Sequence, residues 1–296
     1  MEWKGLINSD GVAIIPNEVR EIDDEAFKDC TNLVSIILPY GVTSIRAFAF
    51  KGCSSLKSIT IPDTLSFIGW NSFKGCTSLK SISIPSGVDL IDYNAFEGCT
   101  KLTSINIPSS IDIEEIGVSV FENCTSLSNI TIPNSVVKIC RRAFYGCKGL
   151  KSLMIPSSVK KIEDEAFFNC NLESINVDPK NSNYVSIDNC LLDSSKTKLI
   201  LGCRSSRIPN GVEVIERSAF EGCTSLEKID IPESVKEIMP EAFCGCTNLK
   251  IINIGQKEKI EIAKDAFKDC PKAIEIGLYD DYWDKFFEEC EREEHE

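Results

Sequence analysis

The stretch that decides the fold runs from Cys53 to Gly75 and reads CSSLKSITIPDTLSFIGWNSFKG. Close copies of it recur along nearly the whole chain, mostly at steps of 23 residues. Each copy has a phenylalanine three residues before the cysteine that opens the next copy. These cysteines are Cys30, Cys53, Cys76, Cys99, Cys124, Cys147, Cys170, Cys223, Cys246 and Cys270. Self-similarity at a period of about 20 to 50 residues predicts a solenoid of stacked coils.

The spacing within one copy predicts the structure of one coil. In the run L-x-x-I-x-I-P, Ile59 and Ile61 lie two residues apart, so they share one face of a strand. Pro62 ends that strand because it cannot donate a ladder hydrogen bond. A V-x-x-I pair and an Ala-Phe then return the chain through a short turn, with Gly or Asn before the cysteine to allow a tight backbone. Stacking coils about 4.8 Å apart would bury the Ile, Phe and Cys side chains in continuous columns.

These motifs resemble the leucine-rich repeats of the BspA-like family, whose pattern runs L-x-x-I-x-I-P-x-x-V-x-x-I-x-x-x-A-F-x-x-C. The resemblance covers about residues 14 to 278. It implies a leucine-rich repeat solenoid shaped as a right-handed arc or horseshoe, with a concave parallel β-sheet and short turns, 3-10 or helical segments on the return side. It implies little chemistry, because the family is known mainly for surface-exposed, adhesion-associated bacterial proteins. We therefore expect one solenoid of about 11 coils over residues 1–278.

Four segments depart from the regular copies. The repeat breaks at about 178–207, where two apolar stretches around a polar turn predict a β-hairpin insertion. Aromatic residues at helical spacing predict an amphipathic capping helix with an acidic tail over 279–296. Trp3 and its neighbours could cover the open end of the first coil, since solenoids need caps. Two extra residues within 110–116 predict a solvated loop on the outside.

Composition excludes several classes of protein. A hydrophobic fraction of 43% with 26% charged residues is ordinary for a folded chain. The net charge of -13 argues against nucleic acid or an anionic membrane surface as a partner, because these need a concentrated basic face. No apolar run is long enough to cross a membrane, and the start MEWKGLINSDG lacks the features of a signal peptide. We expect a monomer without membrane insertion.

The fifteen cysteines do not form an obvious disulfide framework, because their number is odd and ten occupy one repeated core position. We interpret those ten as small buried hydrophobic residues with free thiols. Cys190 and Cys203, on opposite sides of the predicted hairpin, are the one pair for which a disulfide stays open. Free thiols favour a cytoplasmic location, whereas the family resemblance implies the cell surface or secretion.

Motifs for catalysis, metal binding and nucleotide binding are missing. The single histidine is His295, which argues against Ser-His-Asp or Cys-His catalysis and against His-based metal sites. Cys244 and Cys246 form a lone C-x-C without the second pair of a zinc site. Neither the dinucleotide-binding nor the P-loop glycine pattern occurs. We predict that the protein is not an enzyme and has no cofactor and no metal.

The outward positions of the predicted strands are the natural place to look for binding. Most are small hydroxyls and amides, which can also hydrogen-bond along a sheet for purely structural reasons. This pattern changes towards the C-terminal coils, and together with the hairpin it gives the candidate partner-binding surface Met154, Asn176, Tyr184, Lys228, Asp230, Ile251 and Asn253.

Three functions fit these residues. We favour a non-enzymatic protein-binding or adhesion-type module for a protein or host-surface partner. The alternatives are a glycan or cell-wall binding module and a structural spacer of a larger surface protein. The glycan alternative is weakened because no solvent-facing aromatic platform is expected; Trp70 is expected mainly to pack against its neighbours.

Overall fold

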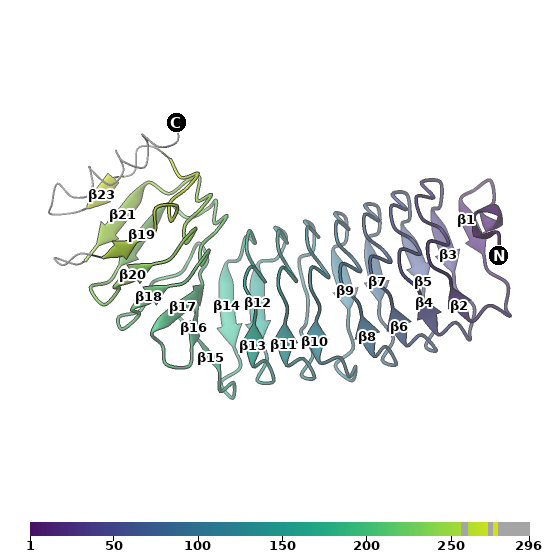
Figure 1. Cartoon of the computed structure of the whole chain (residues 1–296), viewed down its shortest axis with the longest axis horizontal. Helices are drawn as coiled ribbons and strands as arrows, with labels where there is room; N and C mark the ends of the chain where they lie inside the picture. The colour runs from purple at the N-terminus through teal and green to yellow at the C-terminus, as the bar shows by residue number, and fades with distance from the viewer. Residues whose placement is uncertain (256–259, 272–274, 278–296) are drawn as a thin grey trace. The chain divides into compact units, whose positions relative to one another are not determined.

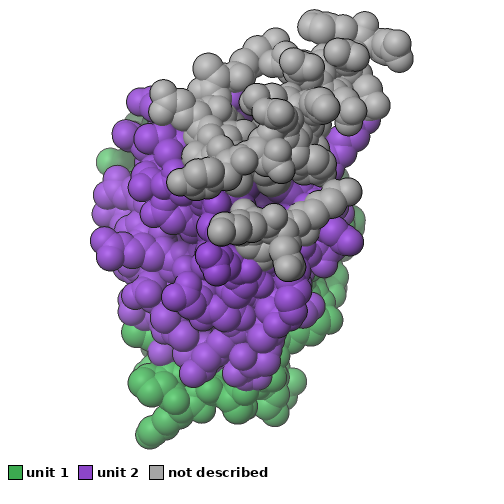
Figure 2. Space-filling view, turned by 90° about the vertical axis from the view of Figure 1, so that its left-hand side faces the viewer, with its two compact units in different colours: residues 1–170, 178–183 green, residues 171–177, 184–296 purple. Residues whose placement is uncertain are grey.

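The computed structural model describes residues 1–255, 260–271 and 275–277. They fall into two compact units, residues 1–170 with 178–183 and residues 171–177 with the chain from 184 onwards (Figure 2). Each unit is a stack of coils with short strands in two rows (Figure 1). The predicted capping helix and acidic tail over 279–296 lie outside the described residues. The extent of a single solenoid over 1–278 stays a prediction.

The first row of strands comes from the L-x-x-I-x-I part of each coil. In β7 the central Ile82 is buried while Ser81 and Ser83 are exposed, as the spacing predicts. Equivalent positions of neighbouring coils pair in parallel, for example Ser81 with Ser104. Unit 1 contains β1 (Val12–Ile14), β3 (Ser35–Ile37), β5 (Ser58–Thr60), β7 (Ser81–Ser83), β9 (Ser104–Asn106) and β12 (Ser152–Ile155). Unit 2 contains β14 (Ser174–Val177), β19 (Lys228–Ile231), β21 (Ile251–Ile254) and β23 (Glu275–Gly277).

The second row comes from the V-x-x-I part, where two-residue strands again pair in parallel. Unit 1 contains β2 (Glu21–Ile22), β4 (Ser44–Ile45), β6 (Phe67–Ile68), β8 (Leu90–Ile91), β10 (Glu115–Ile116), β11 (Lys138–Ile139) and β13 (Lys161–Ile162). Unit 2 contains β18 (Val214–Ile215), β20 (Glu237–Ile238) and β22 (Glu261–Ile262). Hydrogen-bonded turns complete each coil, as predicted for the return side.

Phenylalanine columns fill the interior. From Phe27 to Phe167 in unit 1, successive rings stack nearly parallel with centroids 5.1 to 5.7 Å apart. In unit 2, Phe220, Phe243 and Phe267 stack at 4.9 and 5.0 Å. Trp3, in the 3-10 helix η1 (Trp3–Leu6), meets the Phe27 ring edge-on at 5.7 Å and is 8% exposed. The prediction that Trp3 caps the first coil is confirmed.

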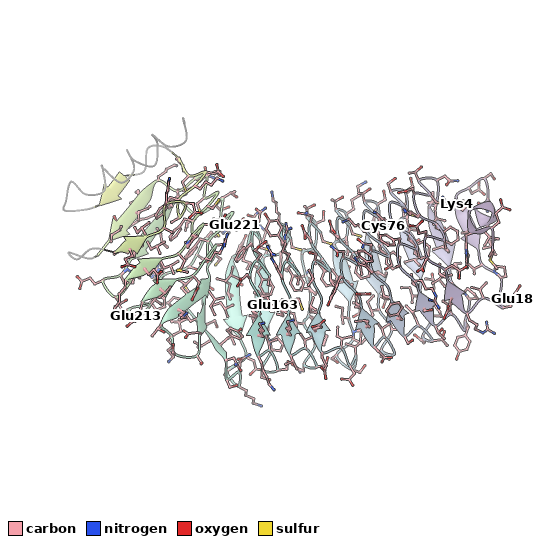
Figure 3. The ribbon with its side chains drawn as sticks, in the orientation of Figure 1. Lys4, Glu18, Cys76, Glu163, Glu213 and Glu221 are labelled. Atoms are coloured by element: carbon pink, nitrogen blue, oxygen red, sulfur yellow. The ribbon has the colours of Figure 1, made fainter. Side chains whose placement is uncertain are left out.

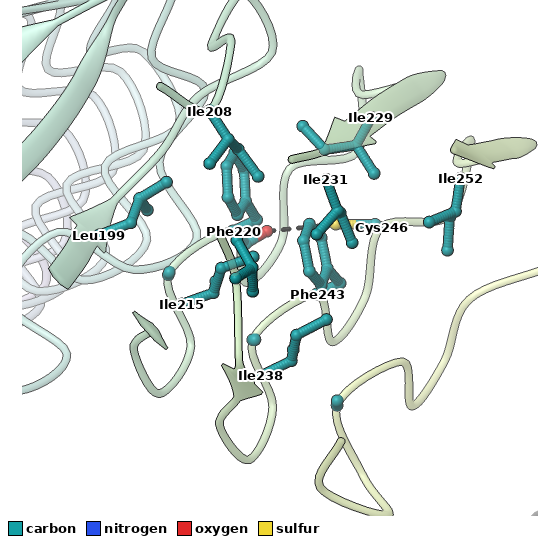
Figure 4. Packing of buried hydrophobic residues seen from close by; sticks show 14 of the residues in the cluster. Leu199, Ile208, Ile215, Phe220, Ile229, Ile231, Ile238, Phe243, Cys246 and Ile252 are labelled. Atoms are coloured by element: carbon teal, nitrogen blue, oxygen red, sulfur yellow. Dashed lines mark hydrogen bonds between the residues drawn. The ribbon is translucent and has the colours of Figure 1, made fainter. Parts of the chain in front are cut away.

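The repeated cysteines form a second column and are more than small hydrophobic residues. In eight of the ten, Sγ donates to the backbone carbonyl of the phenylalanine one coil earlier, for example from Cys246 to Phe220 at 3.2 Å (Figure 4). Cys76, labelled in Figure 3, makes this bond with Phe50. The first cysteine of each unit differs, since Cys30 donates to the Lys28 carbonyl and Cys223 to that of Gly202. All fourteen cysteines from Cys30 to Cys270 are free thiols, so no disulfide joins Cys190 and Cys203. Each of the eight Cys-to-Phe bonds therefore ties two adjacent coils together.

Two backbone positions per coil adopt the left-handed conformation. One precedes the cysteine, where Gly52 has φ 73° and Asn123 has φ 58°, as the predicted tight turn requires. The other lies two residues before the phenylalanine and is usually not glycine; Phe48, for example, has φ 59°. This second position was not predicted, because most side chains found there, such as Phe48 and Arg142, have no preference for positive φ; Asn71 and Asn94 are the exceptions.

The predicted insertion is a meander of three antiparallel strands, β15 (Tyr184–Ile187), β16 (Cys190–Asp193) and β17 (Lys198–Leu201). Strand β17 pairs in parallel with β18, so the meander extends the second row of unit 2. Leu192 and Leu199 are fully buried. A Cβ on Gly202 would lie 2.1 Å from the Phe220 ring, which shows that the chain after β17 covers the first ring of this unit. The meander thus replaces a coil in the core.

The segment with two extra residues is not the solvated loop that the sequence suggested. Ile111 and Ile113 are only 2% and 3% exposed, so the longer coil places an additional apolar side chain in the core. The first row is interrupted next to it, where a single bridge joins Ser104 to Asn129. Burial of Ile113 outweighs exposure of the insertion because an isoleucine gains about 2 kcal/mol on leaving water.

Candidate functional site

Four of the seven predicted binding residues lie together on the first row of unit 2. Lys228 and Asp230 stand on β19 and pair with Ile251 and Asn253 on β21. The Lys228 ammonium lies 3.2 Å from Asp230 Oδ1, and Asn253 Nδ2 donates to the same oxygen. These polar groups largely satisfy one another, which agrees with the structural interpretation of such rows.

The other three predicted residues lie elsewhere. Met154 stands on β12 of unit 1 and is 57% exposed. Asn176 on β14 is exposed, and Tyr184 on β15 is half-buried. Neither β14 nor β15 belongs to the β19-β21-β23 sheet. The seven residues therefore do not form one continuous group of paired strands.

A different apolar surface lies on the second row of unit 1 and the turn that follows it. We call it the aromatic ridge and define it as Phe67, Trp70, Leu90 and Tyr93. Trp70 and Tyr93 occupy the same position in successive coils, and each is 48% exposed. Phe67 and Leu90 are paired on β6 and β8, and Leu90 is 43% exposed. The ridge thus brings large apolar side chains of two adjacent coils to the surface.

Contacts from neighbouring coils hold the two exposed rings of the ridge in place. The Trp70 ring packs against Phe48 with centroids 4.9 Å apart and planes tilted by 60°. The ammonium groups of Lys28 and Lys51 lie 5.6 and 5.2 Å from the Phe48 ring centroid. Tyr93 lies against Gly117 of the next coil, where a Cβ would be 3.2 Å from Tyr93 Cδ1. The expected packing of Trp70 is confirmed, yet half of its surface stays available for a partner.

Carboxylates border the ridge on its C-terminal side. Asp89 precedes Leu90, and Asp92 precedes Tyr93 and accepts its backbone N–H at 2.7 Å. Asp112 and Glu114 belong to the next coil. A hydrogen bond from the Asn94 backbone N–H to the Val118 carbonyl, at 3.0 Å, joins that coil to the coil of Tyr93.

Three of these carboxylates carry unpaired charge. Asp89, Asp112 and Glu114 are exposed, and none of them makes an ion pair with the described part of the chain. On the other side of the ridge, Arg46 is paired with Glu21, and the Lys51 ammonium lies over the Phe48 ring that packs against Trp70. The unneutralised negative charge therefore lies on the C-terminal side of the ridge, beside Leu90 and Tyr93.

The charges of the following coils neutralise one another. The Lys138 ammonium lies 3.0 Å from Glu163, which is labelled in Figure 3, and 3.9 Å from Glu115. The hydrogen bond with Glu163 raises the pKa of Lys138 to about 12. Burial acts to raise the pKa of Glu163, but the bonds from Lys138 and from the Arg141 backbone lower it overall. Such paired groups offer a partner little free charge.

Other chemistry is not apparent in the described ranges. No three His, Cys, Asp or Glu side chains among residues 1–255 and 260–271 are arranged to hold a metal ion. None of the helices in the described part of the chain is both long and apolar enough to span a membrane. Burial raises the pKa of the Cys53 thiol to about 12, so the ladder cysteines are poor nucleophiles.

Two rows of parallel strands, stacked Phe-x-x-Cys coils and a meander in the core define a leucine-rich repeat solenoid. The family model described as the BspA type leucine-rich repeat region matches residues 12–115, 114–202 and 200–291. The chain belongs to this family, and the predicted resemblance is confirmed.

Solved structures agree with this assignment. The chain is similar to a leucine-rich cell surface protein from Faecalibacterium prausnitzii, at 31% identity and TM-score 0.74, over 91% of this chain and 85% of the other. A leucine-rich repeat protein from Eubacterium ventriosum has 22% identity and TM-score 0.55, over 85% and 69% of the two chains. The pneumococcal vaccine antigen PcpA has 20% identity and TM-score 0.54, over 93% and 85%. No curated protein sequence matches the chain.

Proposed function

We propose that this protein is a non-enzymatic module that binds a protein partner through the aromatic ridge, and that it does so at a cell surface. The location is extended from the similar Faecalibacterium prausnitzii protein, which is described as a cell surface protein. The binding role is supported by the repeat family and by the aromatic ridge, whose exposed apolar side chains are not required for packing of the coils. We propose that the module acts as a monomer on a host-surface or matrix protein.

The observation that carries the proposal is the half-exposed pair of Trp70 and Tyr93 beside Leu90. Tryptophan and tyrosine are the side chains most enriched in binding hot spots. The equivalent residues are Ala47 in the coil before Trp70 and Val118 in the coil after Tyr93, and both are much smaller. Covering the remaining half of one ring would remove about 100 Å² of apolar surface from water, worth about 2.5 kcal/mol before the costs of association.

Binding to an array of immobilised matrix proteins tests the proposal. We expect wild-type protein to bind at least one of them and the double variant Trp70→Ala/Tyr93→Ala to lose at least tenfold in affinity. The matched control is Tyr40→Ala, which removes an aromatic ring that is 81% exposed and lies outside the ridge. Equal binding by the double variant and the wild type would exclude the ridge as the binding surface. A wild-type array without any binding would favour the structural spacer.

Glycan binding is a second candidate because half-exposed rings can stack on sugars. The expectation that no aromatic platform faces solvent was wrong, since Trp70, Tyr93 and Tyr40 are all at least 48% exposed. A glycan array separates the two functions. Glycan binding that Trp70→Ala abolishes, with no binding to matrix proteins, would assign the ridge to carbohydrate.

The first-row residues of unit 2 remain a proposed second contact surface. Replacing Lys228 by Ala frees Asp230 from its ion pair and should change binding to the same array if this row contacts the partner. Unchanged binding, with circular dichroism unchanged as well, would leave these residues a structural role.

A further inference from the structure

We infer that the partner segment bound by the aromatic ridge is cationic, an extended stretch of polypeptide that carries arginine or lysine next to apolar anchors. This inference rests on the proposed function, because it names the chemistry of the partner for the same surface. The inference is supported by charge complementarity between the carboxylates beside the ridge and a cationic partner segment that covers the ridge.

The carboxylates beside the ridge supply the charge. Asp89, Asp112 and Glu114 are exposed and have no cation within the described ranges, whereas Lys138 of the next coil is held by Glu163. A partner that covers Leu90 and Tyr93 must approach these charges. A negatively charged segment would be repelled there, while a guanidinium or ammonium would gain an ion pair that becomes stronger as water is excluded.

The exposed rings favour the same kind of partner. A cation placed over the face of a tryptophan or tyrosine is attracted by the ring quadrupole, and arginine also stacks on such faces. Lys28 and Lys51 already make this kind of contact with Phe48, next to Trp70. Arginine is therefore suited to both parts of the surface, the ring faces and the carboxylates.

The repeat distance sets the length of the bound segment. The stacked rings of Phe73, Phe96 and Phe121, which belong to the coils of Trp70, Tyr93 and Glu114, have centroids 5.3 and 5.7 Å apart, so the three coils span about 11 Å. An extended chain advances about 3.3 Å per residue, so about three residues span these coils.

Three peptides without aromatic residues test the inference on the whole chain. The first is Arg-Leu-Arg-Leu-Arg-Leu-Arg, the second replaces every Leu by Ser, and the third replaces every Arg by Glu. Binding is measured by isothermal titration calorimetry at low and at high salt. We expect the Arg-Leu peptide to bind at least tenfold more tightly than either of the others, and to weaken several-fold at high salt because the ion pairs are screened.

Variants assign that binding to the ridge. Trp70→Ala/Tyr93→Ala should abolish it, and Asp89→Asn/Asp112→Asn/Glu114→Gln should reduce it about tenfold. Tyr40→Ala and Asp10→Asn, which removes an exposed carboxylate of the first coil, should leave it unchanged. Thermal melts followed by circular dichroism check that each variant is folded. If the melt of the double alanine variant differs from that of the wild type, Trp70→Leu is tested in its place, because leucine keeps an apolar side chain against Phe48.

The outcomes separate this inference from the proposed function. Equal binding of the Glu-Leu and Arg-Leu peptides at Trp70 would overturn the cationic partner and leave a protein-binding ridge. If the Arg-Ser and Arg-Leu peptides bind equally and the double variant does not weaken their binding, the inference is overturned, because attraction by net charge alone then explains the binding. If no peptide binds while a matrix protein does so through Trp70, the inference fails and the proposed function stands. Binding to neutral glycans at Trp70 overturns both.

Discussion

Cys99 gives a direct test of the cysteine ladder, because one substitution should destabilise the fold more at pH 7 than at pH 9. The thiol is fully buried, and its Sγ donates to the Phe73 carbonyl at 3.2 Å. Cys99→Ala removes this bond, worth about 1 kcal/mol. It also leaves a void of about one methyl group, which costs about 1 kcal/mol more. The free energy of unfolding at pH 7 should therefore fall by about 2 kcal/mol.

The pH dependence follows from the ionisation of the thiol. Burial raises the pKa of Cys99 well above its ordinary value, so the folded protein keeps this proton at pH 9. The unfolded chain releases it above about pH 8.5 and is stabilised by doing so. The folded state thus loses about 1 kcal/mol at pH 9 through this one thiol. Cys99→Ala lacks that loss, and its difference from wild type should be about half as large at pH 9 as at pH 7.

Urea unfolding followed by circular dichroism at pH 7, 8 and 9 measures the difference. The control is Ile105→Val, which removes one methylene from a residue that is 6% exposed and should cost about 1 kcal/mol at every pH. A difference between Cys99→Ala and wild type that is constant from pH 7 to 9 would refute the assignment of Cys99 as a buried, protonated donor.

Three further substitutions test the columns and their ends. Phe96→Ala should cost about 3 to 5 kcal/mol in urea unfolding, because the ring is fully buried between two stacked neighbours, and unchanged stability would contradict the coil assignment. Trp3→Ala should cost about 3 kcal/mol and speed hydrogen exchange in the first coil before the others. Gly202→Ala should destabilise unit 2 by about 1 to 3 kcal/mol, because its methyl group would overlap the Phe220 ring, and an unchanged melt would show that the meander does not cover this ring.

Much of the fold could be predicted because the period aligns every coil with the next. Counting along the chain placed Phe96 and Cys99 in the core and identified the strands of the first row. It predicted a turn for the V-x-x-I part, which instead forms the two-residue strands of the second row. It could not show that Cys99 donates to the coil before it, because that bond depends on where a neighbouring carbonyl points. Nor could it show that Ile113 turns inwards, since an insertion has no equivalent position in the other coils.

The binding surface was harder to predict than the fold. On the first row, Lys228 and Asp230 differ from the equivalent residues of the other coils and were therefore predicted to bind, but they pair with each other. The same comparison on the second row would have shown Phe67 and Leu90 between Ser44 and Glu115. These two large apolar residues are visible in the sequence. They were not predicted to bind because the V-x-x-I part was predicted to be a turn, and only the outward positions of the first-row strands were expected to form a surface.

The repeat itself explains why the ridge is a sound place to look for function. A coil position whose side chain enters a column must suit the coils before and after it, so the interior permits little variation. Outward positions are free of that requirement, and most of them carry small polar or charged groups. At the ridge, two adjacent coils depart from this rule at two positions each, and the departure ends at Ser44 on one side and Glu115 on the other. Exposing Trp70, Leu90 and Tyr93 beside the half-buried Phe67 does not stabilise the coils, so a partner is the simplest reason for keeping them together.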